Sequence, residues 1–118
     1  MNAPYSVVLR ETTTSTLKSL TQKTGLSANI LARFAMLISF EMTDQIVPGS
    51  GKPGLTINRV SLFGDLETFL MTAFALAGGK ANGGSGGKEM AGHIARGAAY
   101  LNLRCSTLTD FLATVSEL

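Results

Sequence analysis

The chain has 118 residues, of which 45% are hydrophobic and 15% are charged, and its formal net charge at pH 7 is +2. This length predicts a single domain over residues 1–118 that buries a core without a metal or disulfide staple. The longest uncharged apolar stretch, residues 68–79, is too short to span a membrane. The sequence has one cysteine, and its N-terminus lacks the basic and then apolar segments of a signal peptide. The expected compartment is therefore the cytoplasm.

A strand followed by two helices is predicted over residues 5–43. Residues 5–10 are β-branched in the middle and predict a short strand. Apolar residues then recur at helical spacing over 14–24 and again over 28–43. This order is typical of a ribbon-helix-helix unit, in which strands from two chains pair and the helices build a shared core. The predicted fold class is therefore mostly α, and the high hydrophobic fraction indicates an oligomer.

The turn between these two helices is predicted to be tight. Gly25 can adopt a left-handed conformation after a helix without strain, and Ser27 can accept a hydrogen bond from the free N–H groups of the next helix. Upstream, the hydroxyl side chains of residues 12–15 offer several N-caps for the first helix.

Residues 44–65 are expected to form an irregular connection. Glycines and prolines crowd its first half, where no regular element is predicted to persist. Its second half, residues 55–63, is predicted to be extended or irregular.

Further packed helices are predicted over residues 66–118. The first, over 66–77, is apolar nearly all round, so most of it is expected to be buried. The glycine-rich residues 78–88 predict a flexible loop. A long helix follows over 89–104, and Ser106 or Thr107 is predicted to cap a short terminal helix.

Two segments of the chain are basic. Residues 1–40 and residues 80–104 each hold four basic residues and one acidic residue. If the two segments merge, they form one positive face that favours a polyanion, and a symmetric oligomer would multiply it. Ordinary solvated lysines give the same pattern, so both interpretations stay open.

No catalytic or metal site is predicted. The glycine-rich loop is not a P-loop, because Asn82 stands where that motif needs glycine and Glu89 where it needs a hydroxyl. His93 is the single histidine and is expected to be structural. Cys105 lacks a second cysteine, so a buried apolar role is expected. The chain is therefore expected to be no enzyme and to need no cofactor or metal.

Three blocks of sequence match a known pattern, in the same order and at this chain length. They are T-G-L-S-A-N-I-L-A-R at 24–33 with S-F-E at 39–41, N-R-V-S-L-F-G-D at 58–65, and H-I-A-R-G at 93–97. Together they resemble DndE, a family of small bacterial proteins of DNA sulfur modification, or phosphorothioation. The resemblance covers roughly residues 5–112.

This resemblance implies a ribbon-helix-helix-like, mostly helical protein that assembles as a tetramer and binds duplex DNA with a preference for nicks. It also implies a supporting role beside DndC and DndD when sulfur replaces a non-bridging phosphate oxygen. Three of the expected DNA-binding residues lie in the matching blocks, and two lysines are added from the first helix. The five are Lys18, Lys23, Arg33, Arg59 and Arg96. An arginine in such a block also commonly ties a loop in place, so both roles stay open for the three arginines.

Two other functions stay open. A sequence-specific repressor of the ribbon-helix-helix type needs base-reading side chains on its strand, and residues 5–10 are poor in them. A scaffold within the same complex would instead use its basic residues to bind a protein.

Overall fold

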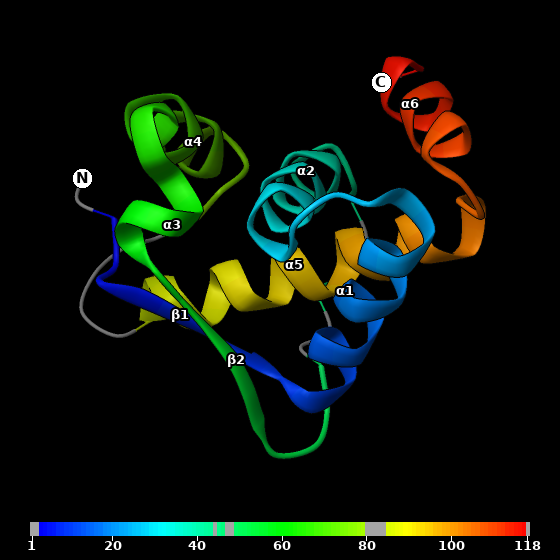
Figure 1. The fold of residues 1–118 in the computed structure, drawn as a ribbon. Coiled ribbons are helices and arrows are strands. Elements are labelled where there is room, and N and C mark those ends of the chain that lie inside the picture. The colour runs from blue at the N-terminus through cyan, green and yellow to red at the C-terminus, as the bar shows by residue number, and fades with distance from the viewer. Residues whose placement is uncertain (1–2, 44, 47–48, 80–84, 118) are drawn as a thin grey trace.

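The structure is a computed structural model that describes residues 3–43, 45–46, 49–79 and 85–117. It is mostly helical with one two-stranded sheet (Figure 1). In chain order the elements are β1 (Ser6–Arg10), α1 (Glu11–Thr24), α2 (Ala28–Phe40), β2 (Pro53–Asn58), α3 (Arg59–Phe63), the 3-10 turn η1 (Gly64–Leu66), α4 (Glu67–Leu76), α5 (Ser85–Arg104) and α6 (Leu108–Ser116).

The predicted order of strand, helix and helix is confirmed, but the ribbon forms within one chain. β1 pairs antiparallel with β2, and Val7 lies opposite Ile57. Within the irregular connection expected over 44–65, the extended conformation predicted from residue 55 is confirmed as far as Asn58, because β2 covers Pro53–Asn58. The prediction is wrong for Arg59–Phe63, which form the short helix α3, and for residues 53 and 54, which already belong to β2. Pro53 is tolerated because it is the first residue of the strand, and pairing with β1 satisfies the backbone groups that follow.

The first helices begin and end at slightly different residues than predicted. α1 begins at Glu11, so the threonines lie inside it, and the Thr14 and Thr16 hydroxyls donate to the carbonyl oxygens of Arg10 and Thr12. α2 ends at Phe40, short of the predicted residue 43.

The tight turn between α1 and α2 is confirmed. Gly25 has φ 78°, in the left-handed region, and its N–H donates to Thr21. The Ser27 hydroxyl accepts a hydrogen bond from the Ile30 N–H at 3.4 Å. At the other end of the chain, Thr107 caps α6 by accepting from the Asp110 N–H at 3.1 Å.

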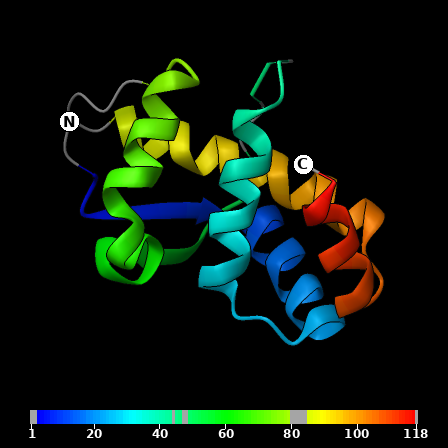
Figure 2. The same ribbon diagram turned by 90° about the horizontal axis from the view of Figure 1, so that it is seen from above.

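α5 is the central helix of the fold and packs against α2, α1 and β1. In two perpendicular views, α4 and α6 lie at opposite ends of the molecule, with α2 crossing α5 between them (Figures 1 and 2). The crossing is close at Gly97, where a Cβ atom would lie 1.8 Å from the Ala35 carbonyl oxygen. Glycine is required there because any side chain would push the two helices apart.

α5 begins at Ser85, so the predicted flexible loop 78–88 is too long at its C-terminal end. Residues 80–84 of that loop lie outside the described residues. Gly86 is buried, and a Cβ at Gly87 would lie 3.5 Å from the Ser6 carbonyl oxygen. Packing against the N-terminal segment thus outweighs the low helix propensity of glycine.

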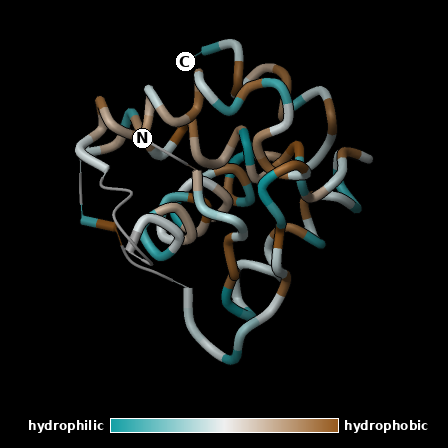
Figure 3. The backbone as a smooth tube through the Cα atoms, turned by 90° about the vertical axis from the view of Figure 1, so that its left-hand side faces the viewer, coloured by the Kyte–Doolittle hydropathy of each residue, from teal (hydrophilic) through white to brown (hydrophobic). Residues whose placement is uncertain are grey.

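The expectation that α4 is mostly buried is wrong. Along much of the chain, hydrophobic positions are interspersed with hydrophilic ones (Figure 3). On α4, however, some large apolar side chains are exposed to solvent. Phe69 is 58% exposed and Leu76 is 85% exposed, while Val60 on the neighbouring α3 is 79% exposed. These three residues are called the α3–α4 apolar face below.

Of the helices that the structure describes, none has the length and apolar character needed to cross a lipid bilayer.

Candidate nucleic-acid interface

The five basic residues predicted from the sequence lie on four different helices and contact different segments. They are Lys18 and Lys23 on α1, Arg33 on α2, Arg59 on α3 and Arg96 on α5. Their contacts decide which of them have donors available for a ligand.

Arg33 holds α3 against α2. Its Nε donates to the Leu62 carbonyl oxygen at 2.6 Å, and its terminal N–H group donates to the Ser61 carbonyl oxygen at 3.1 Å. These carbonyls belong to the last turn of a short helix, whose acceptors have no partner within the helix. The guanidinium therefore has a structural role at this position.

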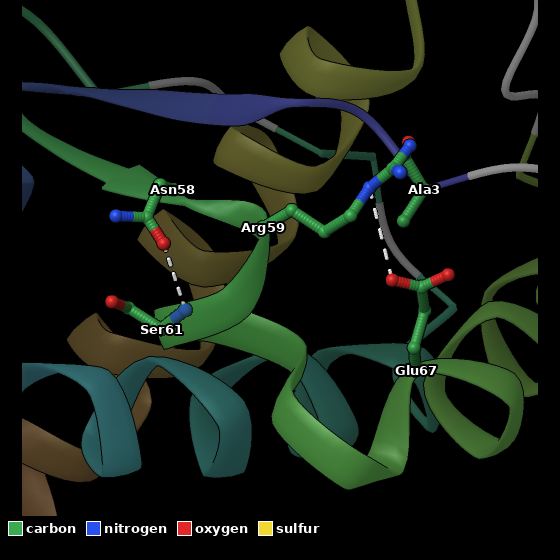
Figure 4. Close-up of polar contacts among 5 residues, drawn as sticks. All are labelled: Ala3, Asn58, Arg59, Ser61 and Glu67. Carbon is green, nitrogen blue, oxygen red and sulfur yellow. Dashed lines mark hydrogen bonds and ion pairs between the residues drawn. The ribbon is translucent and has the colours of Figure 1, made fainter.

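The Arg59 side chain links the start of α3 to the N-terminal segment (Figure 4). A terminal N–H group donates to the Ala3 carbonyl oxygen, and the guanidinium carbon lies 5.0 Å from the centroid of the Tyr5 ring. The Arg59 Nε lies 3.7 Å from a Glu67 carboxylate oxygen, which is too long for a hydrogen bond, so this ion pair is loose. Beside it, the Asn58 side-chain oxygen accepts from the Ser61 N–H at 2.8 Å and caps α3.

Arg96 and His93 meet at Ser39, near the end of α2. The Arg96 Nε donates to the Ser39 hydroxyl oxygen at 2.8 Å, and a terminal N–H group donates to the Ser39 carbonyl oxygen at 2.7 Å. The His93 Nδ1 lies 2.7 Å from the same hydroxyl. A serine oxygen can accept from arginine while its hydrogen points to a neutral imidazole nitrogen.

His93 is only 3% exposed and packs edge-on against Phe40 and Phe74. Burial lowers the pKa of His93 from 6.5 to about 4, and repulsion by the Arg96 guanidinium is the second cause. The imidazole is therefore neutral at pH 7. The burial of His93 agrees with its predicted structural role. Cys105 is also buried, which agrees with the buried apolar role predicted for it.

The two lysines of α1 differ. The Lys23 ammonium donates to the Asn102 side-chain oxygen at 2.8 Å and so links α1 to α5. Lys18 is exposed, and no ion pair or hydrogen bond to another described residue engages its ammonium.

Two hollows lie along one side of α5, on either side of Gly49, which lines both. The first measures 630 Å³, and the second measures 500 Å³. Four basic side chains line them: Arg10 and Lys88 the first, Arg96 and Arg104 the second. The two basic segments of the sequence thus meet on this side, because β1 and the start of α1 pack against α5.

Sequence reasoning did not select Arg10 and Arg104 as binding residues. Both belong to the basic segments 1–40 and 80–104, and that uneven charge was the available signal. Their placement beside the same helix depends on tertiary packing, which local patterns do not carry.

Among the residues that the structure describes, no three histidine, cysteine or acidic side chains gather as metal ligands.

The fold and the site define a small, mostly helical protein that begins with a strand and two helices and carries basic side chains along α5. A family model described as DNA sulphur modification protein DndE matches residues 7–108. The chain belongs to the DndE family, so the resemblance noted in the sequence is confirmed.

A solved structure shares this fold. The crystal structure of DndE from Escherichia coli B7A, involved in DNA phosphorothioation modification, superposes with a TM-score of 0.71 at 24% sequence identity. The match covers 85% of this chain and 98% of that chain. No match was found among curated protein sequences.

Proposed function

We propose that the chain is a DNA-binding accessory protein of the phosphorothioation machinery, which binds intact or nicked duplex DNA through phosphate contacts and catalyses no step itself. Membership of the DndE family supports a place in DNA sulfur modification. The observation that carries the DNA-binding part is the meeting of two basic segments along α5. Phosphate contacts supply most of the affinity in binding that does not depend on sequence.

The five residues predicted from the sequence stay proposed DNA contacts, with unequal availability. Lys18 is exposed and unengaged among the described residues, so it can reach a phosphate without losing another bond. Lys23 would have to share its ammonium with Asn102. Arg33, Arg59 and Arg96 each donate a hydrogen bond to a backbone carbonyl oxygen. A guanidinium has five N–H donors, so it can also donate to a phosphate.

The proposal includes self-association as a homotetramer, work beside DndC and DndD, and a cytoplasmic location. The α3–α4 apolar face supports a protein partner, because a partner that covered Val60, Phe69 and Leu76 would remove large apolar side chains from water. The same face is the observation that favours a second candidate function, a scaffold that binds another protein of the complex and not DNA.

The proposal predicts that the isolated chain binds DNA at low salt. In fluorescence anisotropy titrations, intact and singly nicked duplexes of several unrelated sequences are expected to bind, the nicked ones more tightly, with affinity that falls steeply as salt rises. Absence of binding to both duplexes at low salt would refute DNA binding. If the chain binds no DNA but captures DndC or DndD, that result would favour the scaffold function. A single tight footprint on one DNA sequence would instead favour a sequence-specific repressor.

A further inference from the structure

One side of α5 faces both hollows. The α5 residues that line them include Lys88, Gly92, Ala95, Ala99 and Leu103, which recur every three or four positions and so lie on one face of the helix. The stretch from residue 88 to residue 104 rises by roughly 24 Å at 1.5 Å per residue. One strand of B-DNA places about seven phosphates along that length, at about 3.4 Å of helix axis per step.

The charges on this side match a polyanion. Arg10 and Lys88 are exposed, and neither side chain bonds to another residue in the described part of the chain. Arg104 is exposed and lies over the Tyr100 ring, with its guanidinium carbon 3.6 Å from the ring centroid. This stacking holds the guanidinium plane while leaving its edge N–H groups to a phosphate. Among the described lining residues, Glu89 is the carboxylate on this side.

The small residues between these cations allow close approach. Ala95 and Ala99 line the second hollow together with Arg96 and Arg104. The 500 Å³ of this hollow is the space beside the two alanines that part of a sugar–phosphate backbone would occupy. Lys18, by contrast, lines a separate hollow between α1 and Leu55, where no second cation is among the described lining residues.

We propose that one DNA strand runs along this side of α5, with Arg10 and Lys88 bound to phosphates at one end and Arg104 at the other. These three side chains and Tyr100 are called the α5 surface. The inference rests on the proposed DNA binding and deepens it, since it assigns the main phosphate contacts to the α5 surface and not to the outer face of α1. Three cations per chain that neutralise three phosphates give a slope of log affinity against log salt of roughly −2.7.

The test compares salt dependence between variants of the full chain. The triple variant Arg10→Gln, Lys88→Gln and Arg104→Gln removes the cations of the α5 surface at exposed positions, where such changes cost little stability. Lys18→Gln probes the outer face of α1. Thr68→Glu on α4 lowers the net charge by one unit, as Lys18→Gln does, and is the control for charge per unit because it changes an exposed residue that lines neither hollow. Melting temperatures confirm that each variant is folded.

The expected result is a large loss confined to the triple variant. Between about 50 and about 200 mM salt, three phosphate contacts account for a roughly 40-fold fall in affinity. The triple variant is expected to lose this dependence, so that its slope is shallower by about one unit for each cation removed. Lys18→Gln is expected to change the slope by at most about one unit, and Thr68→Glu should leave it unchanged.

Two outcomes separate failure of this inference from failure of the proposed function. If the unmodified chain binds DNA and the triple variant keeps its slope and affinity, the α5 surface is not the binding site. The same conclusion follows if Lys18→Gln lowers the slope more than the triple variant does. If the unmodified chain binds neither duplex, the DNA-binding function itself is refuted.

Discussion

Gly97→Ala is expected to lower the free energy of unfolding by about 3 kcal/mol or more. The added Cβ would lie 1.8 Å from the Ala35 carbonyl oxygen and 2.4 Å from its carbonyl carbon. Both atoms are backbone of α2, so no side chain can rotate away, and α2 and α5 must separate. Urea denaturation followed by circular dichroism measures the change.

Gly87→Ala is the matched control within the same helix. Its Cβ would lie 3.5 Å from the Ser6 carbonyl oxygen, an ordinary contact distance. Because alanine has the higher helix propensity, this variant is expected to be neutral or more stable by up to about 1 kcal/mol. Equal stability of the two variants would show that α2 and α5 do not cross closely at Gly97.

The second large effect is a loss of stability in mild acid caused by His93. Its folded pKa, about 4, lies below the unfolded value of 6.5, so the unfolded chain binds the proton more readily. The stability contributed by the neutral, buried imidazole is complete above pH 6.5 and declines as the pH falls from 6.5 toward 4. The expected fall in the free energy of unfolding between pH 7.5 and pH 5 is about 2 kcal/mol.

Urea denaturation at a series of pH values measures this fall, and His93→Gln is the control. His93 is the single histidine of the sequence, so the variant is expected to show a flatter profile from pH 7.5 to pH 5 whatever its absolute stability. Proton NMR of the unmodified chain provides a second measurement, in which the imidazole should remain neutral at pH 5.5. An imidazole that titrates near 6.5 in the folded chain would contradict the burial described here.

The turn at Gly25 could be predicted from sequence because its causes are local. Positive φ at a glycine and a serine cap depend on residues within one turn of the chain. β2 and the start of α5 depend on distant partners. Pro53 and the glycines near residue 86 oppose regular structure locally, and they are held in place by pairing with β1 and by packing against the N-terminal segment.

The candidate site was predictable in its charge and not in its geometry. The basic segments 1–40 and 80–104 are visible in the sequence, but the sequence does not show which cations have donors to spare. Arg33 and Arg96 bond to the carbonyls of neighbouring helices, whereas Arg10 and Lys88 line one hollow unengaged by described residues. That distinction requires the positions of α3, the end of α2 and β1 around them.

The phosphorothioate content of genomic DNA tests most directly whether this chain serves sulfur modification by binding DNA phosphates. The measurement uses cells that hold the other Dnd proteins but lack this chain, with the modified linkages counted by mass spectrometry after nuclease digestion. The unmodified chain is expected to restore modification. The triple variant of the α5 surface, present at equal level and equally stable, is expected not to restore it. Full restoration by the triple variant, or unchanged modification without the chain, would contradict this role.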